Sequence, residues 1–149
     1  MICELTRDGA RALSPYLREL DTTLMEALSY HDDVAYYCES RIEIPGPKWM
    51  MVHERPEAMG GLQVTCPGTL TGWVVASRGW EAHKLEAIRY MKRVIDYAIV
   101  SGMANRVQAW VLAESAMANR MAATVGLSFE ARIAKLANGR DVNIWARVK

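Results

Sequence analysis

One short segment, Arg78-Gly-Trp-Glu-Ala-His-Lys84, carries four titratable side chains. Glutamate and histidine often transfer protons at active sites, so Glu81 and His83 are the best-placed candidate acid–base pair. Arg78 and Lys84 could meet phosphate oxygens. The alternative interpretation is that all four are solvated residues at the beginning of a helix, which is the ordinary role of such a run.

Two other histidines lie beside acidic residues. His53-Glu54 ends an expected strand and could border a groove for an acceptor substrate. His31-Asp32-Asp33 superficially resembles a metal cluster, but adjacent residues rarely converge on one ion without distant ligands. A loop with a helix cap is the favoured interpretation, and we predict no metal site.

Length and composition limit the protein classes. The chain has 149 residues, of which 51% are apolar and 23% charged, and we predict one domain covering residues 1–149. A net charge of +1 and the lack of a basic tract argue against a nucleic-acid partner. No apolar run is long enough to span a bilayer, and no secretion signal is evident, so we expect no membrane partner. Three widely spaced cysteines predict a reducing cytoplasm, or a virion assembled there.

The elements that must position these residues follow from periodicity and turn residues. We expect an opening strand, a helix from Thr6 or Asp8, and an amphipathic helical region from a Ser14-Pro15 cap. The next segment suits either helix or strand. Three extended stretches with short antiparallel connections follow, and then a long helix capped by Gly102. The ranges, in chain order, are 1–6, 15–28, 34–44 (ambiguous), 48–54, 60–66, 70–77 and the long helix after Trp80.

The last third of the chain predicts a strand, a helix and a hairpin. The strand covers 106–113, and the helix covers 114–125 and ends at Gly126. Two further strands, 127–136 and 141–148, meet at Asn138-Gly139, the strongest local hairpin signal because both residues tolerate positive φ. Gly60-Gly61 predicts a bulge or a close backbone approach.

Five tryptophans are many for this length. Trp73, Trp110 and Trp145 alternate within expected strands, which predicts core positions. Trp80 lies in a loop between strand and helix, and we expect it to be the most exposed and to touch a ligand or partner.

This order of elements resembles the GNAT superfamily of N-acetyltransferases over nearly the whole chain. The resemblance implies an α+β fold with a mixed, mostly antiparallel central sheet, helices on both faces and a C-terminal β-hairpin. It also implies that acetyl-CoA or CoA lies where the fourth strand, Thr71 to Ser77, diverges from the fifth. The strand's backbone would pair with pantetheine, and the following helix N-terminus would hold the pyrophosphate.

The resemblance assigns the cofactor to the following positions: Val74, Val75, Ala76, Ser77, Arg78, Gly79, Lys84, Leu85, Ser115 and Ala118.

The sequence departs from the family motifs. The family's phosphate loop reads Arg/Gln-x-x-Gly-x-Gly/Ala, but this chain has only Gly79, and Glu81 would repel a pyrophosphate. In the second motif Ser115 replaces an asparagine. Ala122 stands where many members carry a tyrosine that protonates the thiolate, and an alanine cannot transfer a proton. The sequence assigns no catalytic residue, and the candidates are Glu81, His83 and Ser115.

A narrower group of proteins departs from the family motifs in the same way. The GNAT-like proteins of short-tailed bacteriophages, including a small internal virion protein, are similar in Gly60-Gly61, Trp73-Val-Val75, Tyr90-Met91 and Trp110. A phage protein would act in the host cytoplasm or in the virion.

Three functions stay open. The first is acetyl transfer from acetyl-CoA to an amine of a small molecule or protein. The second is a catalytically degenerate phage protein that keeps the fold and binds a host or virion protein. The third is an acyl-CoA or peptide-binding module. A homodimer is also left open.

Overall fold

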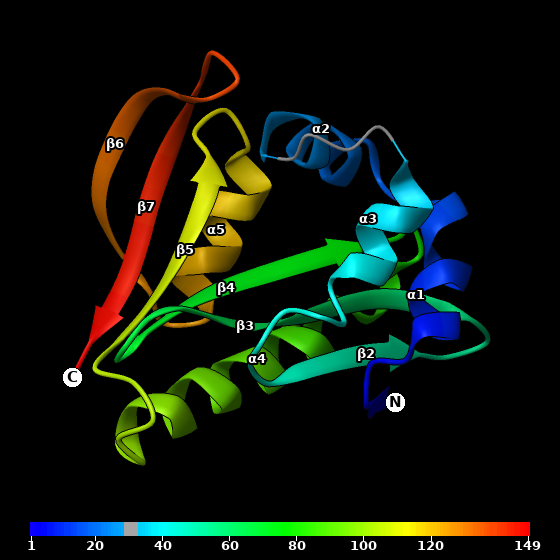
Figure 1. Cartoon of the computed structure of the whole chain (residues 1–149), viewed down its shortest axis with the longest axis horizontal. Coiled ribbons are helices and arrows are strands. Elements are labelled where there is room, and N and C mark those ends of the chain that lie inside the picture. The colour runs from blue at the N-terminus through cyan, green and yellow to red at the C-terminus, as the bar shows by residue number, and fades with distance from the viewer. Residues whose placement is uncertain (29–32) are drawn as a thin grey trace. The chain divides into compact units, whose positions relative to one another are not determined.

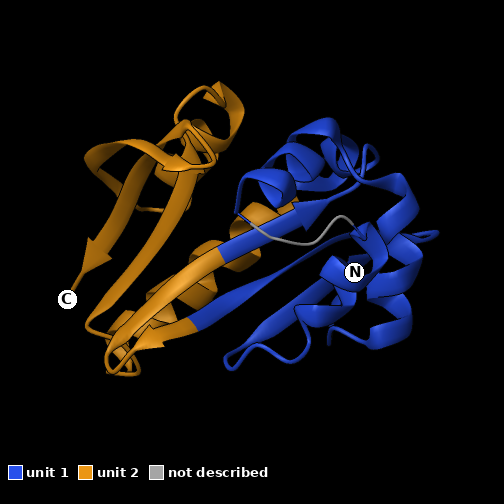
Figure 2. Cartoon of the chain, turned by 45° about the horizontal axis from the view of Figure 1, so that its top comes forward, with its two compact units in different colours: residues 1–63, 73–84 blue, residues 64–72, 85–149 orange. Residues whose placement is uncertain are grey.

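The structure is a computed structural model that describes residues 1–28 and 33–149 (Figure 1). The predicted loop residues His31 and Asp32 lie outside the described residues. The described chain forms two compact units (Figure 2). Unit 1 contains residues 1–63 and 73–84, and unit 2 contains residues 64–72 and 85–149. That residues 1–149 form one domain stays a prediction.

The fold is mixed α+β, as predicted. In the described part of the chain, seven strands are hydrogen-bonded in the order β1-β2-β3-β4-β5-β7-β6. The pairs β1–β2, β2–β3, β5–β7 and β6–β7 are antiparallel, whereas β4 and β5 are parallel. Strand β7 lies between β5 and β6, so the last strand of the chain is not at the edge of the sheet.

Unit 1 begins with β1 (Ile2–Cys3) and α1 (Arg7–Leu13). Thr6 caps α1 by accepting a hydrogen bond from the Gly9 amide at 3.1 Å, as one of the two predicted starts requires. A 3₁₀ turn (Ser14–Tyr16) and α2 (Glu19–Leu28) follow. The predicted continuous helical region from residue 15 was wrong, because the helical segments are interrupted at Leu17, which is extended and forms a β-bridge with Ser77.

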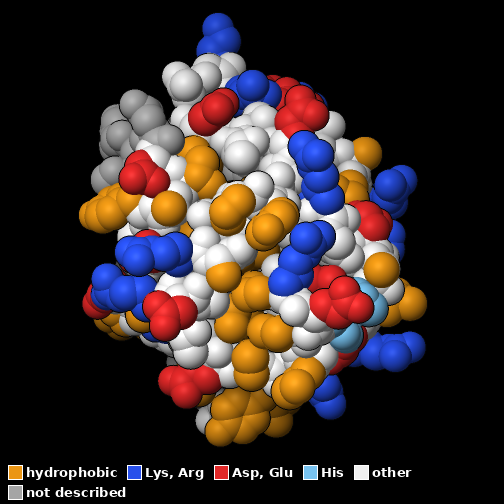
Figure 3. All heavy atoms as spheres, turned by 90° about the vertical axis from the view of Figure 1, so that its right-hand side faces the viewer, with side chains coloured by type: hydrophobic (Ala, Val, Ile, Leu, Met, Phe, Trp, Pro, Cys, Tyr) orange, Lys and Arg blue, Asp and Glu red, His pale blue; other side chains and the backbone are white. Residues whose placement is uncertain are grey.

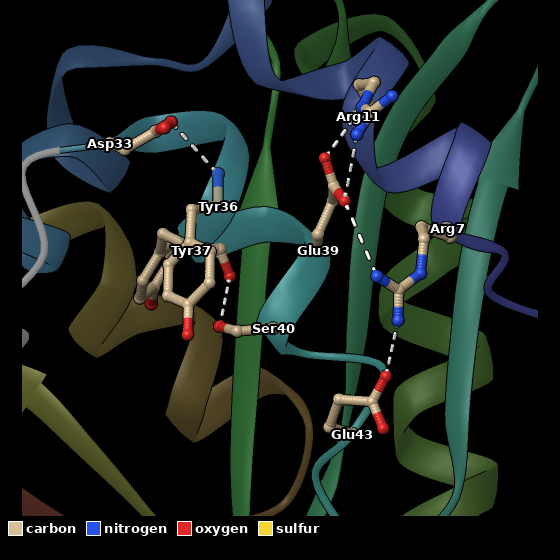
Figure 4. Close-up of polar contacts among 8 residues, drawn as sticks. All are labelled: Arg7, Arg11, Asp33, Tyr36, Tyr37, Glu39, Ser40 and Glu43. Carbon is tan, nitrogen blue, oxygen red and sulfur yellow. Dashed lines mark hydrogen bonds and ion pairs between the residues drawn. The ribbon is translucent and has the colours of Figure 1, made fainter.

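The ambiguous segment resolves as helix α3 (Val34–Ser40), and the Asp33 side chain caps it by accepting from the Tyr36 amide at 3.0 Å. Figure 4 shows ion pairs that join α1 to α3 and to the segment that follows α3. Arg11 donates to Glu39 at 2.7 Å, and Arg7 donates to Glu43 at 2.6 Å. The arginines are exposed, so these pairs contribute little to stability.

The core of unit 1 is built by apolar side chains from α1, α2, α3 and the strands. Its buried members are Leu5, Ala10, Leu13, Leu17, Met25, Tyr37, Cys38, Met50, Met59 and Val75. The predicted close approach at Gly60 is confirmed, because a Cβ there would lie 2.6 Å from the Trp49 ring and 2.9 Å from the Trp73 carbonyl oxygen. Only glycine fits between these groups.

The remaining strands of this part are β2 (Lys48–Val52), β3 (Pro56–Cys66) and β4 (Thr69–Ala76). Helix α4 (Trp80–Val100) follows β4 and ends before Gly102, whose φ of +78° confirms the predicted cap. Both β3 and β4 run from one unit into the other, as does α4. None of the helices in the described part of the chain has the length and apolarity that a bilayer crossing requires.

Unit 2 contains β5 (Arg106–Leu112), α5 (Ala116–Thr124), β6 (Ser128–Ala137) and β7 (Arg140–Val148). Gly126 ends α5 with φ +95°. Asn138 and Gly139 both have positive φ, at 49° and 80°, and join β6 to β7. The predicted strand, helix and hairpin are therefore all confirmed.

Two tryptophan predictions were wrong. Trp80 is 2% exposed rather than solvent-facing, because it is the first residue of α4 and packs inward. Trp110 is 41% exposed rather than core, although the next two residues of β5, Val111 and Leu112, are buried.

Candidate cofactor-binding edge of strand β4

The C-terminal half of β4 has two edges with different partners, and both are visible within unit 1. The Ser77 amide donates to the Glu57 carbonyl oxygen at 2.7 Å, so Ser77 faces β3. Backbone groups of successive strand residues point to opposite edges. Ala76 therefore faces the other edge, where its carbonyl oxygen accepts from the Arg18 amide at 3.0 Å.

The segment that contacts this edge comes from the start of α2. The Arg78 amide donates to the Tyr16 carbonyl oxygen at 3.2 Å, and Leu17 forms the bridge to Ser77. Asp21 accepts a hydrogen bond from the Ala76 amide. Residues 16–21 thus occupy backbone groups of Ala76 and Arg78, two of the positions expected to contact the cofactor.

A buried ion pair holds this segment in place. The Arg18 Nε atom donates to Asp21 Oδ2 at 2.6 Å, and the two side chains are 12% and 3% exposed. Burial raises the pKa of the Asp21 carboxyl above its ordinary value, and the hydrogen bond from Arg18 and its charge oppose that rise. Arg18 also lies over the Trp80 ring, 5.6 Å from its centre.

Val74 lies between two sets of backbone contacts. Pairing of β4 with β5 runs from Thr69–Arg106 to Gly72–Ala109. The contacts with residues 16–21 begin at Ala76. Alternation places the Val74 N–H and C=O on the same edge as those of Ala76. These two groups have the geometry to pair with an extended chain of amides.

The turn before α4 satisfies several of its own amides. The buried Ser77 hydroxyl accepts from the Gly79 amide at 3.1 Å. The Trp80 amide donates to the Ser77 carbonyl oxygen at 3.2 Å, and the Ala82 amide donates to that of Gly79 at 3.3 Å. Three amides near the expected pyrophosphate site, those of Gly79, Trp80 and Ala82, therefore have partners within the turn.

The candidate acid–base residues separate in the structure. Glu81 binds the Lys84 ammonium group at 2.6 Å, and both side chains are partly exposed. The His83 ring instead stacks on His53, with 3.7 Å between the ring centres. The remaining predicted contact on this helix, Leu85, is 61% exposed.

The two predicted cofactor residues of α5 are described within unit 2. Ser115 is the N-cap of α5, and its hydroxyl accepts from the Ala118 amide at 3.3 Å. Ala118 is half-buried. Their predicted contact with a cofactor stays a prediction.

Sequence reasoning missed Asn119, which connects α5 to two strands. Its Nδ2 atom donates to the Ser115 carbonyl oxygen at 2.7 Å and to that of Leu112 at 3.1 Å. Its Oδ1 atom accepts from Asn143 and from the Trp145 indole N–H, both at 2.8 Å. The available signal was an asparagine among alanines on a short helix. Asparagine is unfavourable in a helix interior, so its presence there indicates that its side chain makes a specific contact.

The sequence also missed Asp21 and Glu57. Asp21 lies on the apolar stripe between Leu17 and Met25, four residues from each. A charged residue at such a position is rarely buried unless it is paired, and this was the available signal. Glu57 is 8% exposed at the start of β3, where the flanking sequence gives no comparable sign.

Comparisons with solved structures bear on the fold. The GNAT-family acetyltransferase from Bacillus anthracis matches with a TM-score of 0.74 at 13% identity, covering 99% of this chain and 93% of that one. YncA from Salmonella typhimurium, solved with its cofactor acetyl-CoA, also has a TM-score of 0.74 at 13% identity, covering 99% and 92%. The chain has the GNAT acetyltransferase fold.

A further GNAT-fold match is the microcin C7 self-immunity acetyltransferase MccE, solved with acetyl-CoA and AMP. Its TM-score is 0.76 at 13% identity, covering 99% of this chain and 91% of that one. No protein-family model and no curated protein matches the sequence. At such identities the likeness establishes the GNAT fold alone.

Proposed function

We propose that this GNAT-fold protein binds acetyl-CoA and transfers its acetyl group to an amine of a small molecule or protein. The pantetheine arm would pair with the Val74 N–H and C=O, and the pyrophosphate would lie near the N-terminus of α4. Similar folds solved with acetyl-CoA support the choice of cofactor.

The observation that carries the proposal is the position of Val74. Its backbone groups lie on the edge of β4 after the pairing with β5 ends at Gly72 and before the Tyr16–Asp21 contacts begin at Ala76. Pantetheine contains two amides in an extended chain, so it can satisfy one N–H and one C=O on a strand edge. Such pairing gives affinity through the main chain and does not depend on side-chain identity.

The phosphates would be attracted by exposed cations beside a long helix. Arg78 is exposed and Lys84 is 44% exposed. Helix α4 has 21 residues, and its N-terminus carries about half a positive charge. Glu81 offsets part of this attraction, because it is the ion-pair partner of Lys84.

The chemistry would depend mainly on positioning. The amine nitrogen forms a bond to the thioester carbonyl carbon, the C–S bond breaks, and the amine proton goes to a base or to water. The leaving thiolate takes a proton from solvent, because Ala122 cannot supply one. Holding the two reactants together can provide most of the acceleration. Glu81, His83 and Ser115 remain the candidate proton-transfer residues.

One observation favours the alternative, a protein that keeps the fold without the chemistry. Ala76 and Arg78 use backbone groups to bind residues 16–21 of the same chain. These positions would otherwise contact the cofactor. In this alternative the protein would act through a host or virion protein partner, and it would not bind acetyl-CoA.

Isothermal titration of acetyl-CoA and CoA into matched variants separates these functions. Val74→Pro removes the backbone N–H that would donate to pantetheine, and proline is tolerated at a strand edge, whereas Val74→Ala keeps this N–H. We expect Val74→Pro to weaken binding, Val74→Ala to retain it, and Lys84→Glu to abolish it. Equal affinity in the two Val74 variants would contradict the pairing.

Turnover is measured separately, as cofactor-dependent acetylation of amines in a cell extract. Acetyl-CoA binding without any acetylated product would favour a regulatory acyl-CoA-binding module. If neither binding nor an acetylated product is detected, the catalytically degenerate protein is favoured. Mass spectrometry of purified phage particles would then test for a virion component.

A further inference from the structure

Three metal-binding side chains come together in unit 1, on the side of Ser77 that faces β3. His53 follows β2, Glu57 is near the start of β3, and His83 is in the first turn of α4. The turn that carries His53 is closed by a hydrogen bond from its amide to the Arg55 carbonyl oxygen at 3.2 Å. One potential ligand atom from each of the three side chains lies within 4.8 Å of the other two.

Glu57 supplies the strongest indication of a ligand. The residue is 8% exposed, and its Oε2 atom is buried with no hydrogen-bond donor among the described residues. His83 Nε2 lies 3.8 Å from Glu57 Oε2, which is too long for a hydrogen bond. A buried carboxylate oxygen without a donor costs at least about 1–3 kcal/mol, so this atom requires a cation or a proton.

The surroundings hold the carboxylate at this place. The Glu57 carbonyl oxygen accepts from the Ser77 amide at 2.7 Å, which fixes the backbone. Gly79 leaves room for the side chain, because a Cβ there would lie 3.2 Å from Glu57 Oε1. The carboxylate is therefore directed into the cluster by β3, β4 and the turn before α4.

The two imidazole rings complete the set from the solvent side. They stack with 3.7 Å between centres and 16° between planes. His53 is exposed and the His83 side chain is 38% exposed. Figure 3 shows histidine atoms at the surface beside acidic side chains. An ion can therefore enter from solvent, and a water molecule can complete its coordination.

We propose that His53, Glu57 and His83 form a binding site for a divalent transition-metal ion of the Zn²⁺ class. Two imidazoles and one carboxylate suit Zn²⁺, Co²⁺ or Ni²⁺, whereas Mg²⁺ and Ca²⁺ prefer all-oxygen sites. Zn–ligand distances of about 2.0–2.2 Å place tetrahedral ligands about 3.3 Å apart, so the cluster must contract slightly on binding. Rotation of the exposed His53 side chain can provide this contraction.

This proposal departs from the sequence prediction of no metal site. Metal binding here would not require acetyl-CoA. A bound ion would connect the β2–β3 turn to the first turn of α4. Because the ion binds the folded chain, it stabilises that chain by mass action.

Co²⁺ titration tests the proposal, because four-coordinate Co²⁺ gives strong visible absorption. We expect one ion per chain, displacement by Zn²⁺, and no displacement by Mg²⁺ or Ca²⁺. His53→Ala and His83→Ala should each weaken binding by at least about tenfold. His31→Ala removes the third histidine of the chain and serves as the matched control, with affinity unchanged.

Thermal unfolding gives a second measurement. Zn²⁺ should raise the melting temperature of the unmodified chain, EDTA should reverse the rise, and His53→Ala should not show it. His53 is an exposed turn residue, so the variant is expected to fold. No Co²⁺ absorption, or unchanged binding when both His53 and His83 are replaced, would overturn the proposal.

Discussion

Replacing Arg18 by methionine should destabilise the protein strongly, because it leaves Asp21 buried without its cation. The two side chains are 12% and 3% exposed and are joined at 2.6 Å. Methionine keeps most of the length and apolar contact of arginine, so the change removes mainly the charge and its hydrogen bonds.

The size of the effect follows from the burial of the pair. Removing one member of a buried ion pair costs about 3–5 kcal/mol, because the remaining charge is uncompensated. The total free energy of unfolding of a domain is about 5–15 kcal/mol, so a large part of it would be lost. Asp21 also accepts the Ala76 amide, so its displacement would disturb the edge of β4 beside Val74.

The loss should depend on pH with a definite sign. The pKa of Asp21 in the folded chain is raised above the ordinary value of 3.8, so the folded state holds this proton to higher pH than the unfolded state does. The stability from this group is present below pH 3.8 and disappears as pH rises through the raised pKa. Removing Arg18 raises that pKa further. Arg18→Met should therefore destabilise least in acid and most at neutral pH.

Urea unfolding of the variants at neutral and acid pH measures this effect. Arg18→Met/Asp21→Asn should recover most of the loss at neutral pH, because asparagine is uncharged and still accepts the Ala76 amide. Arg11→Met is the matched control, because Arg11 is 68% exposed and Glu39 keeps Arg7 at 3.9 Å, so the urea midpoint should change little. A loss for Arg18→Met that is small, or equal at both pH values, would refute this reasoning.

Three further predictions concern single positions. Asn119→Ala leaves the Trp145 indole N–H without its acceptor and should lower the free energy of unfolding by about 1–3 kcal/mol. Urea titrations that follow tryptophan fluorescence measure this change, and a loss below about 1 kcal/mol would contradict the role of Asn119. Gly60→Ala should destabilise more than Gly139→Ala in thermal unfolding, because a Cβ meets Trp49 at 2.6 Å in the first and nothing within 4 Å in the second. Burial raises the pKa of the Cys38 thiol to about 12, so a thiol reagent at mildly alkaline pH should modify the other two cysteines and reach Cys38 only after unfolding; rapid reaction at all three would contradict the burial.

Local chemistry made much of the fold predictable. Gly102, Gly126 and the Asn138-Gly139 pair all have the positive φ that their residue types favour, so helix ends and the hairpin could be placed from sequence. Thr6 and Asp33 cap helices by the same local logic. These signals depend on residues within a few positions of each other.

Contacts between distant segments were not predictable in this way. Leu17 continues an apolar helical period, yet it is extended because it pairs with Ser77 of β4. Trp80 follows Gly79 in what reads as a loop, but the helix begins at Trp80 and buries its ring. In both cases tertiary packing overrides a local pattern.

The candidate sites show the same division. The order of elements identified the strand and helix of the expected cofactor site. It gave no sign that residues 16–21 bind the backbone of Ala76 and Arg78. It also treated His53 and His83 separately, because they lie thirty positions apart in the chain. Their meeting with Glu57 depends on the pairing of β2 with β3 and on the position of α4 after β4.

Titration of acetyl-CoA into the unmodified chain and the two Val74 variants tests the central claim most directly. We expect heat of binding for the unmodified chain and for Val74→Ala, and clearly weaker binding for Val74→Pro. No heat from the unmodified chain at high micromolar cofactor would contradict the claim.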